Sequence, residues 1–138
     1  MKISAKVQNS EGRHDVTLRT NDNVHRLDIP SKPAGFGSST NGGELLLLAL
    51  ATCYCNDVYR EAAKRGLKVE RVEVEVEGEF GAEGEPAKSV SYRAKVTAPA
   101  SKAQIQELMR QTDRVAEIQN TLRLGTPVIL SSIEAVTV

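Results

Sequence analysis

The stretch TNGGELLLLALATCYCNDV, residues 40–58, decides how this chain of 138 residues folds. Thr40 or Asn41 can cap a helix, and the residues that follow predict one running from about Gly43 to Lys64. Its first half is apolar on every face, whereas its second half is amphipathic. A helix of this kind runs into the interior of a fold or of a dimer.

The second half of this helix ends in the segment DVYREAAKRG, which starts at Asp57 and contains both apolar and charged residues. We expect one buried side formed by Val58, Tyr59, Ala62 and Ala63. Asp57 and Arg60 are interpreted as solvated residues of the opposite side. Gly66 is well placed to end the helix in a left-handed cap.

The rest of the chain predicts antiparallel strands and two further helices. Apolar and polar residues alternate in five segments, Ile3–Val7, Val16–Leu18, Val24–Ile29, Val72–Val76 and Val90–Val96. Ser101 caps a helix that carries Leu108, and a short helix or turn carries Ile118. The last segment, residues 125–138, is interpreted as a final strand. The order predicts an α+β fold with an antiparallel sheet, in one domain spanning residues 1–138.

Composition excludes several classes of partner. The chain has 18 basic and 18 acidic residues, so no net field points to nucleic acid or to an anionic membrane. Three tyrosines, two phenylalanines and no tryptophan leave little for base stacking. The longest apolar run, Leu45 to Cys55, is about half of what a bilayer span needs. The N-terminus lacks the apolar core of a signal peptide, so we expect a cytoplasmic protein with reduced thiols.

The only two cysteines, Cys53 and Cys55, are one residue apart. They provide two metal ligands, and His14 and His25 are far away on expected strands, so we predict no metal site and no cofactor. A disulfide between them is disfavoured because residues i and i+2 of a helix point about 200° apart. Two interpretations stay open from the residues alone: both are small core residues, or one is a nucleophilic thiolate.

The motif TNGGELLLLALATCYCNDV resembles the signature of the OsmC/Ohr family, the organic hydroperoxide reductases and their relatives. The likeness continues through AAKRGLKVERVEVEVEGEF, VSYRAKVTAPASKAQIQELM and NTLRLGTPVIL. The resemblance implies an OsmC-like fold, in which an antiparallel sheet wraps around a long central helix, and an intertwined homodimer. It makes Cys53 the peroxide-reactive cysteine. The resemblance also implies that the catalytic arginine comes from an early strand of the partner subunit, where Arg13 is the best match and Arg19 and Arg26 are alternatives.

Further site residues follow from the same resemblance. Asn41 matches the asparagine that opens the helix, and Glu44 is one residue beyond the position of the family glutamate, where this chain has Gly43. We expect an apolar wall of Leu46, Leu50 and Phe36 to favour organic peroxides. Phe36 has a second interpretation as a loop anchor packed over the helix.

The family's second, resolving cysteine is replaced by Ala116 in the segment AEIQNTL. A sulfenic acid at Cys53 would therefore need an external thiol reductant, an intersubunit Cys55 or a local opening of the helix. Two hypotheses follow: a hydroperoxide reductase that uses Cys53 with an external thiol, or a redox-inactive family member that binds an apolar small molecule or serves only as a dimeric binding module.

Overall fold

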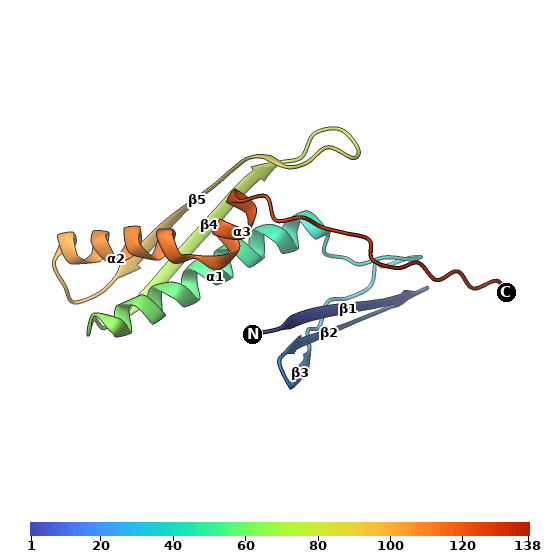
Figure 1. Cartoon of the computed structure of the whole chain (residues 1–138), viewed down its shortest axis with the longest axis horizontal. Helices are drawn as coiled ribbons and strands as arrows, with labels where there is room; N and C mark the ends of the chain where they lie inside the picture. The colour runs from blue at the N-terminus through green and yellow to red at the C-terminus, as the bar shows by residue number, and fades with distance from the viewer. The chain divides into compact units, whose positions relative to one another are not determined.

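The computed structural model describes residues 1–138, which form two units, Met1–Leu46 and Leu47–Val138. The elements along the chain are β1 (Ile3–Ser10), β2 (Arg13–Thr20), β3 (Asn23–Arg26), α1 (Gly42–Lys64), β4 (Arg71–Glu79), β5 (Lys88–Thr97), α2 (Lys102–Val115) and α3 (Glu117–Arg123) (Figure 1). All of the strand pairs are antiparallel. The predicted α+β class with antiparallel sheet is therefore confirmed.

The first unit contains a three-stranded sheet in the order β1-β2-β3. Val7 lies opposite Val16 across the β1–β2 pair, as the alternation of apolar residues predicts. Of this unit's apolar side chains only Val16 and Ile29 are buried, whereas Ile3 and Val7 of β1 are exposed. The sheet thus has a small core of its own and leaves apolar side chains uncovered.

Helix α1 begins at Gly42, one residue before the predicted start at about Gly43. The side chain of Asn41 accepts a hydrogen bond from the Glu44 backbone N–H at 2.8 Å, and the Glu44 carboxylate accepts one from the Asn41 N–H at 3.1 Å. This reciprocal cap satisfies two backbone donors at the start of the helix. Beyond its last residue, Gly66 has a φ of 65°, the left-handed conformation that ends helices.

The core of the second unit lies between α1, α2 and the β4–β5 hairpin (Figure 1). Its buried centre consists of Tyr54, Val58, Ala62 and Leu108, and the inward residues of both strands pack against it. The prediction that Tyr59 and Ala63 share this buried side is wrong, since both are exposed. The i, i+4, i+8 spacing of the three buried α1 residues places one narrow stripe against the hairpin.

Helices α2 and α3 follow the hairpin as predicted. The hydroxyl of Ser101 accepts a hydrogen bond from the Gln104 N–H at 3.2 Å, and the Gln104 side chain accepts one from the Ser101 N–H at 3.0 Å. Ala116 separates the two helices and is fully buried. Its extended backbone turns the chain, so that α3 starts at Glu117.

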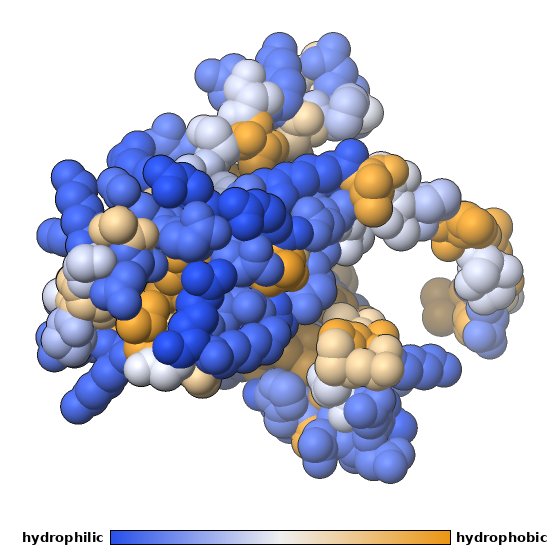
Figure 2. All heavy atoms as spheres, turned by 60° about the vertical axis from the view of Figure 1, so that its left-hand side comes forward, coloured by the Kyte–Doolittle hydropathy of each residue, from blue (hydrophilic) through white to orange (hydrophobic).

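The predicted final strand at residues 125–138 is wrong. This segment contains no strand (Figure 1). Its apolar side chains are exposed, Val128 at 100%, and hydrophobic residues are visible at the surface of the molecule (Figure 2). Alternating apolar residues form a strand only when a neighbouring strand completes the ladder, and this segment has no such neighbour. None of the helices is both long and apolar enough to cross a bilayer.

Candidate functional site

One face of α1 brings Cys53 together with charged side chains. The Cys53 thiol donates a hydrogen bond to Asp57 Oδ2 at 3.5 Å. Arg60 Nη1 lies 3.1 Å from Asp57 Oδ1. The spacings of four and three residues place these three side chains one above the other on the helix. The half-buried thiol is therefore surrounded by ionisable groups of its own helix.

A second carboxylate reaches the thiol from the start of α3. Glu117 Oε1 is 2.9 Å from Arg60 Nη1, and Glu117 Oε2 is 4.0 Å from Cys53 Sγ. α3 is held at α1 by the buried side chain of Gln119, whose Nε2 donates to the Leu50 carbonyl at 2.9 Å. We call Cys53, Asp57, Arg60 and Glu117 the Cys53 cluster.

Burial and the charges of the cluster keep the proton on the Cys53 thiol. Burial raises the pKa of Cys53, and the nearby carboxylates add to this effect, while a hydrogen bond from the Ile118 backbone N–H opposes it. Burial also raises the pKa of Asp57, and its hydrogen bond with Glu117 raises it further. Hydrogen bonds, first from its own backbone and then from Asp57 and Arg60, lower the pKa of Glu117. The thiol is thus predominantly neutral at pH 7.

Three atoms of this cluster have the chemistry of metal ligands. The donor atoms of Cys53, Asp57 and Glu117 all lie within 4.8 Å of one another. However, Arg60 already bonds both carboxylates and neutralises part of their charge, so a cation would have to displace it. No fourth protein ligand joins the three donors. We therefore assign no metal to the cluster.

Cys55 lies in different surroundings. Both cysteines are free, as the sequence predicts for two helical residues one position apart. Cys55 lines a surface groove of about 250 Å³ together with Ala51, Thr52, Asn56 and Val74. None of these neighbours is charged. The groove therefore offers this thiol no acid, base or counter-ion.

Five of the predicted site residues belong to the first unit: Arg13, Phe36, Asn41, Glu44 and Leu46. The guanidinium of Arg13 is 2.7 Å from Asp15 and its side chain is 74% exposed. Phe36 is exposed in the loop before α1. Asn41 and Glu44 bond each other in the helix cap. Their contribution to a site at Cys53 stays a prediction.

The structure shows where two leucines of the predicted apolar wall lie and where Ala116 replaces the second cysteine. Leu46 is half-buried near the start of α1, and Leu50 is buried on the same face as Cys53. Ala116 lies directly before Glu117 and is buried. A methyl group therefore stands where the resemblance places a second thiol.

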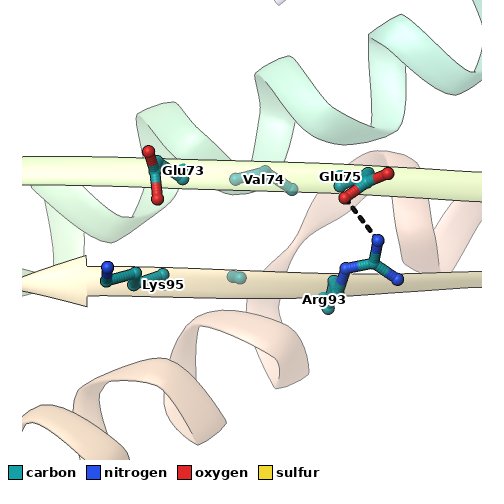
Figure 3. Close-up of a pocket in the computed structure, with 6 residues that line it drawn as sticks. Glu73, Val74, Glu75, Arg93 and Lys95 are labelled. Carbon is teal, nitrogen blue, oxygen red and sulfur yellow. Dashed lines mark hydrogen bonds and ion pairs between the residues drawn. The ribbon is translucent and has the colours of Figure 1, made fainter.

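A second depression, of about 430 Å³, lies on the outer face of the β4–β5 hairpin (Figure 3). Its charged side chains come in opposite signs: Arg93 pairs with Glu75 at 2.6 Å, and Lys95 lies across from Glu73 in the strand register. The acidic face of β4 is thus neutralised by β5, as expected for a solvated strand face. It contains no cysteine, serine, threonine or histidine.

Sequence reasoning missed three members of the cluster. The interpretation of Asp57 as a solvated residue is wrong, because Asp57 is only 6% exposed. Arg60 is partly exposed but bonds both carboxylates. The spacing of Cys53, Asp57 and Arg60 on one helix face was a signal available in the sequence. Glu117 carried no such signal, since only the position of α3 brings it to Cys53.

A known protein family and a known protein both match parts of this chain. Residues 35–131 match the model of a family described as OsmC-like protein. The uncharacterized protein YmaD of Bacillus subtilis is 36% identical over 67 residues, which cover 48% of this chain and 45% of YmaD. The chain therefore matches less than half the length of that relative.

Solved structures of several proteins have a similar fold, among them the following two. An OsmC-like protein from Mycoplasma pneumoniae is 18% identical, with a TM-score of 0.59 over 87% of both chains. A protein from Legionella pneumophila, described as an organic hydroperoxide resistance protein OsmC, is 19% identical, with a TM-score of 0.60 over 89% of this chain and 90% of its own. At such identities these similarities concern the fold alone.

Proposed function

The chain belongs to the family of OsmC-like proteins, and within that family we propose that it is a thiol-dependent hydroperoxide reductase with Cys53 as the peroxidatic nucleophile. The observation that carries the proposal is a free, half-buried thiol that donates to Asp57 and lies 4.0 Å from Glu117, two carboxylates that Arg60 joins. Ionisable side chains with shifted pKa values gather at functional sites more often than elsewhere, and this cluster has three of them around one thiol. The Legionella relative's description as a hydroperoxide resistance protein supports the same substrate class.

The proposed reaction is a two-electron transfer from sulfur to peroxide. The deprotonated Cys53 sulfur attacks the distal peroxide oxygen, the O–O bond breaks, and its electron pair leaves with the alkoxide. The alkoxide takes up a proton and departs as an alcohol, while Cys53 becomes a sulfenic acid. Arg13 is the proposed cation that stabilises the developing negative charge.

An external thiol closes the proposed cycle. It condenses with the sulfenic acid to a mixed disulfide and water, and a second thiol then releases Cys53 and leaves as disulfide. Ala116 supports this route, because the chain has no cysteine at the resolving position. We place this chemistry in the cytoplasm, where thiol reductants are abundant.

We also propose a homodimer, in which the whole chain acts as one OsmC-like domain and α1 lies centrally. Exposed apolar residues of both units support an obligatory partner, among them Ile3, Val7, Ile129 and Ile133. The proposed substrate site includes Asn41, Glu44 and an apolar wall of Leu46, Leu50 and Phe36. Sedimentation should find twice the mass of the 15.0 kDa chain.

The direct test is peroxide consumption by the purified, reduced protein. Cumene hydroperoxide should disappear in the presence of dithiothreitol or dihydrolipoamide, and Cys53→Ser should abolish this loss while Cys55→Ser retains it. Absence of turnover in the wild type, or turnover that survives Cys53→Ser, would refute the proposal. The remaining candidate would then be a redox-inactive member that binds an apolar small molecule or serves as a dimeric binding module.

A further inference from the structure

Asp57 lies where a proton acceptor for the Cys53 thiol would lie. Its Oδ2 atom is 3.5 Å from Cys53 Sγ and accepts the thiol's hydrogen bond. The residue is 6% exposed, so bulk water has little access to this carboxylate. A reaction that needs the thiol deprotonated therefore has a group in place to receive the proton.

Its neighbours orient this carboxylate. Arg60 Nη1 is bound to the other oxygen, Oδ1, at 3.1 Å, which leaves Oδ2 to face the sulfur. Arg60 also bonds Glu117 Oε1 at 2.9 Å and Glu61 Oε1 at 3.2 Å, so the guanidinium is fixed on three sides. Glu117 Oε2, at 4.0 Å from the sulfur, is the remaining charged atom near it. The arrangement divides the roles between the two oxygens of Asp57.

We propose that Asp57 is a second catalytic residue, which takes the Cys53 thiol proton on Oδ2 and returns it to the alkoxide leaving the peroxide. This inference rests on the proposed hydroperoxide reductase function. In one turnover the S–H bond breaks and the proton moves to Asp57. Sulfur attacks the distal oxygen, which keeps its hydrogen, and the O–O electron pair goes to the alkoxide. The proton on Asp57 then completes the alcohol, and the carboxylate is restored.

The electrostatics of the cluster agree with this role. A thiol with a raised pKa is rarely ionised at pH 7, so a fixed acceptor is more useful to it than to an ordinary cysteine. Burial raises the pKa of Asp57 toward the operating pH, where acid–base groups work best. Arg60 and Glu117 act as positioning residues, and Glu61 holds Arg60.

The leaving group offers a way to separate this role from a structural one. A cumyl alkoxide is strongly basic and needs a proton as it departs, whereas the acetate released from peracetic acid does not. Iodoacetamide alkylation also needs no proton donor, since iodide leaves unprotonated. The three reagents therefore probe the same sulfur with different demands on Asp57.

The test compares Cys55→Ser with Cys55→Ser/Asp57→Asn, so that Cys53 is the only thiol. Removing a negative charge beside the sulfur should speed alkylation at pH 7. Consumption of cumene hydroperoxide should nevertheless fall about 100-fold, the usual scale of general acid–base catalysis. Peracetic acid consumption should fall much less.

Each contrary outcome has a distinct meaning. If Cys55→Ser consumes neither peroxide, the proposed function fails. Suppose instead that Cys55→Ser consumes both peroxides. The role of Asp57 alone is then overturned if Asp57→Asn leaves the turnover of cumene hydroperoxide unchanged or raises it together with the alkylation rate. It is also overturned if Asp57→Asn lowers the turnover of both peroxides equally. Glu117→Gln, at an exposed position, is the second variant. It should show the same selective loss on a smaller scale, and equal losses with both peroxides would again overturn the role.

Discussion

Cys53 and Cys55 are separated by one residue on α1, yet their surroundings have little in common. Cys53 contacts Asp57 and Glu117, which Arg60 joins, whereas Cys55 lines a groove without a charged side chain. Rotation of about 200° along the helix turns one thiol toward α3 and the other toward β4. The comparison teaches that the chemistry of a cysteine here depends on which element faces it.

The largest effect should come from a substitution in the buried core, because that core holds Cys53 and Cys55 in their different environments. Leu108 is fully buried between the α1 stripe and the hairpin, and Leu108→Ala should lower the free energy of unfolding by about 2–5 kcal/mol. Urea unfolding measures this change. Both cysteines should then react alike with iodoacetamide at urea concentrations where the wild type still protects Cys53. Leu124→Ala, at an exposed position, is the control and should change stability by less than about 0.5 kcal/mol.

The next effect concerns pH. The neutral form of Cys53 is favoured by burial, so its thiolate appears only as the pH rises through its raised pKa. In Cys55→Ser, alkylation of Cys53 should grow about tenfold per pH unit and continue to grow beyond about pH 8.5, the ordinary value for a free cysteine. A plateau reached below that pH would contradict the environment described for Cys53.

A smaller effect should follow from loosening α3. Gln119→Ala removes the buried hydrogen bond to the Leu50 carbonyl and should cost about 1 kcal/mol of stability. We expect α3 to open more often, so that Cys53 is alkylated several times faster while the rate for Cys55 stays constant. Gln106→Ala, an exposed glutamine of α2, is the matched control. Equal acceleration of both cysteines would mean that Gln119 supports the whole unit.

The smallest effect is expected at the other end of α3. Arg123 Nη2 is 2.6 Å from Asp113, but both side chains are nearly half exposed, and such surface pairs contribute about 0.2–1 kcal/mol. Arg123→Gln should therefore change the alkylation of Cys53 less than Gln119→Ala does. Mass spectrometry of the labelled peptides distinguishes the two. If Arg123→Gln had the larger effect, the surface ion pair rather than the buried amide of Gln119 would hold α3 in place.

Much of the fold could be predicted from sequence because its signals are local. The alternation in β1, β2, β4 and β5 and the caps at Asn41 and Ser101 depend on neighbouring residues, and the elements they predicted are present. The strand expected at residues 125–138 failed because a strand also needs a partner, which local pattern does not supply.

The candidate site was predictable only in part for the same reason. The resemblance of residues 40–58 singled out Cys53, and the structure places Asp57 beside its thiol. Glu117 lies 64 positions away and reaches the sulfur through the packing of α3. Asp57 was misassigned because an acidic residue near the middle of a helix is usually solvated, whereas α3 covers this one.

We expect the two thiols to differ in reactivity toward peroxide, and trapping of the oxidised sulfur measures this difference. Reduced wild-type protein would be treated with one equivalent of cumene hydroperoxide and dimedone, and the adduct would be located by peptide sequencing in a mass spectrometer. We expect a dimedone adduct on Cys53 and none on Cys55. An adduct on Cys55 alone, or equal labelling of both residues, would contradict this expectation.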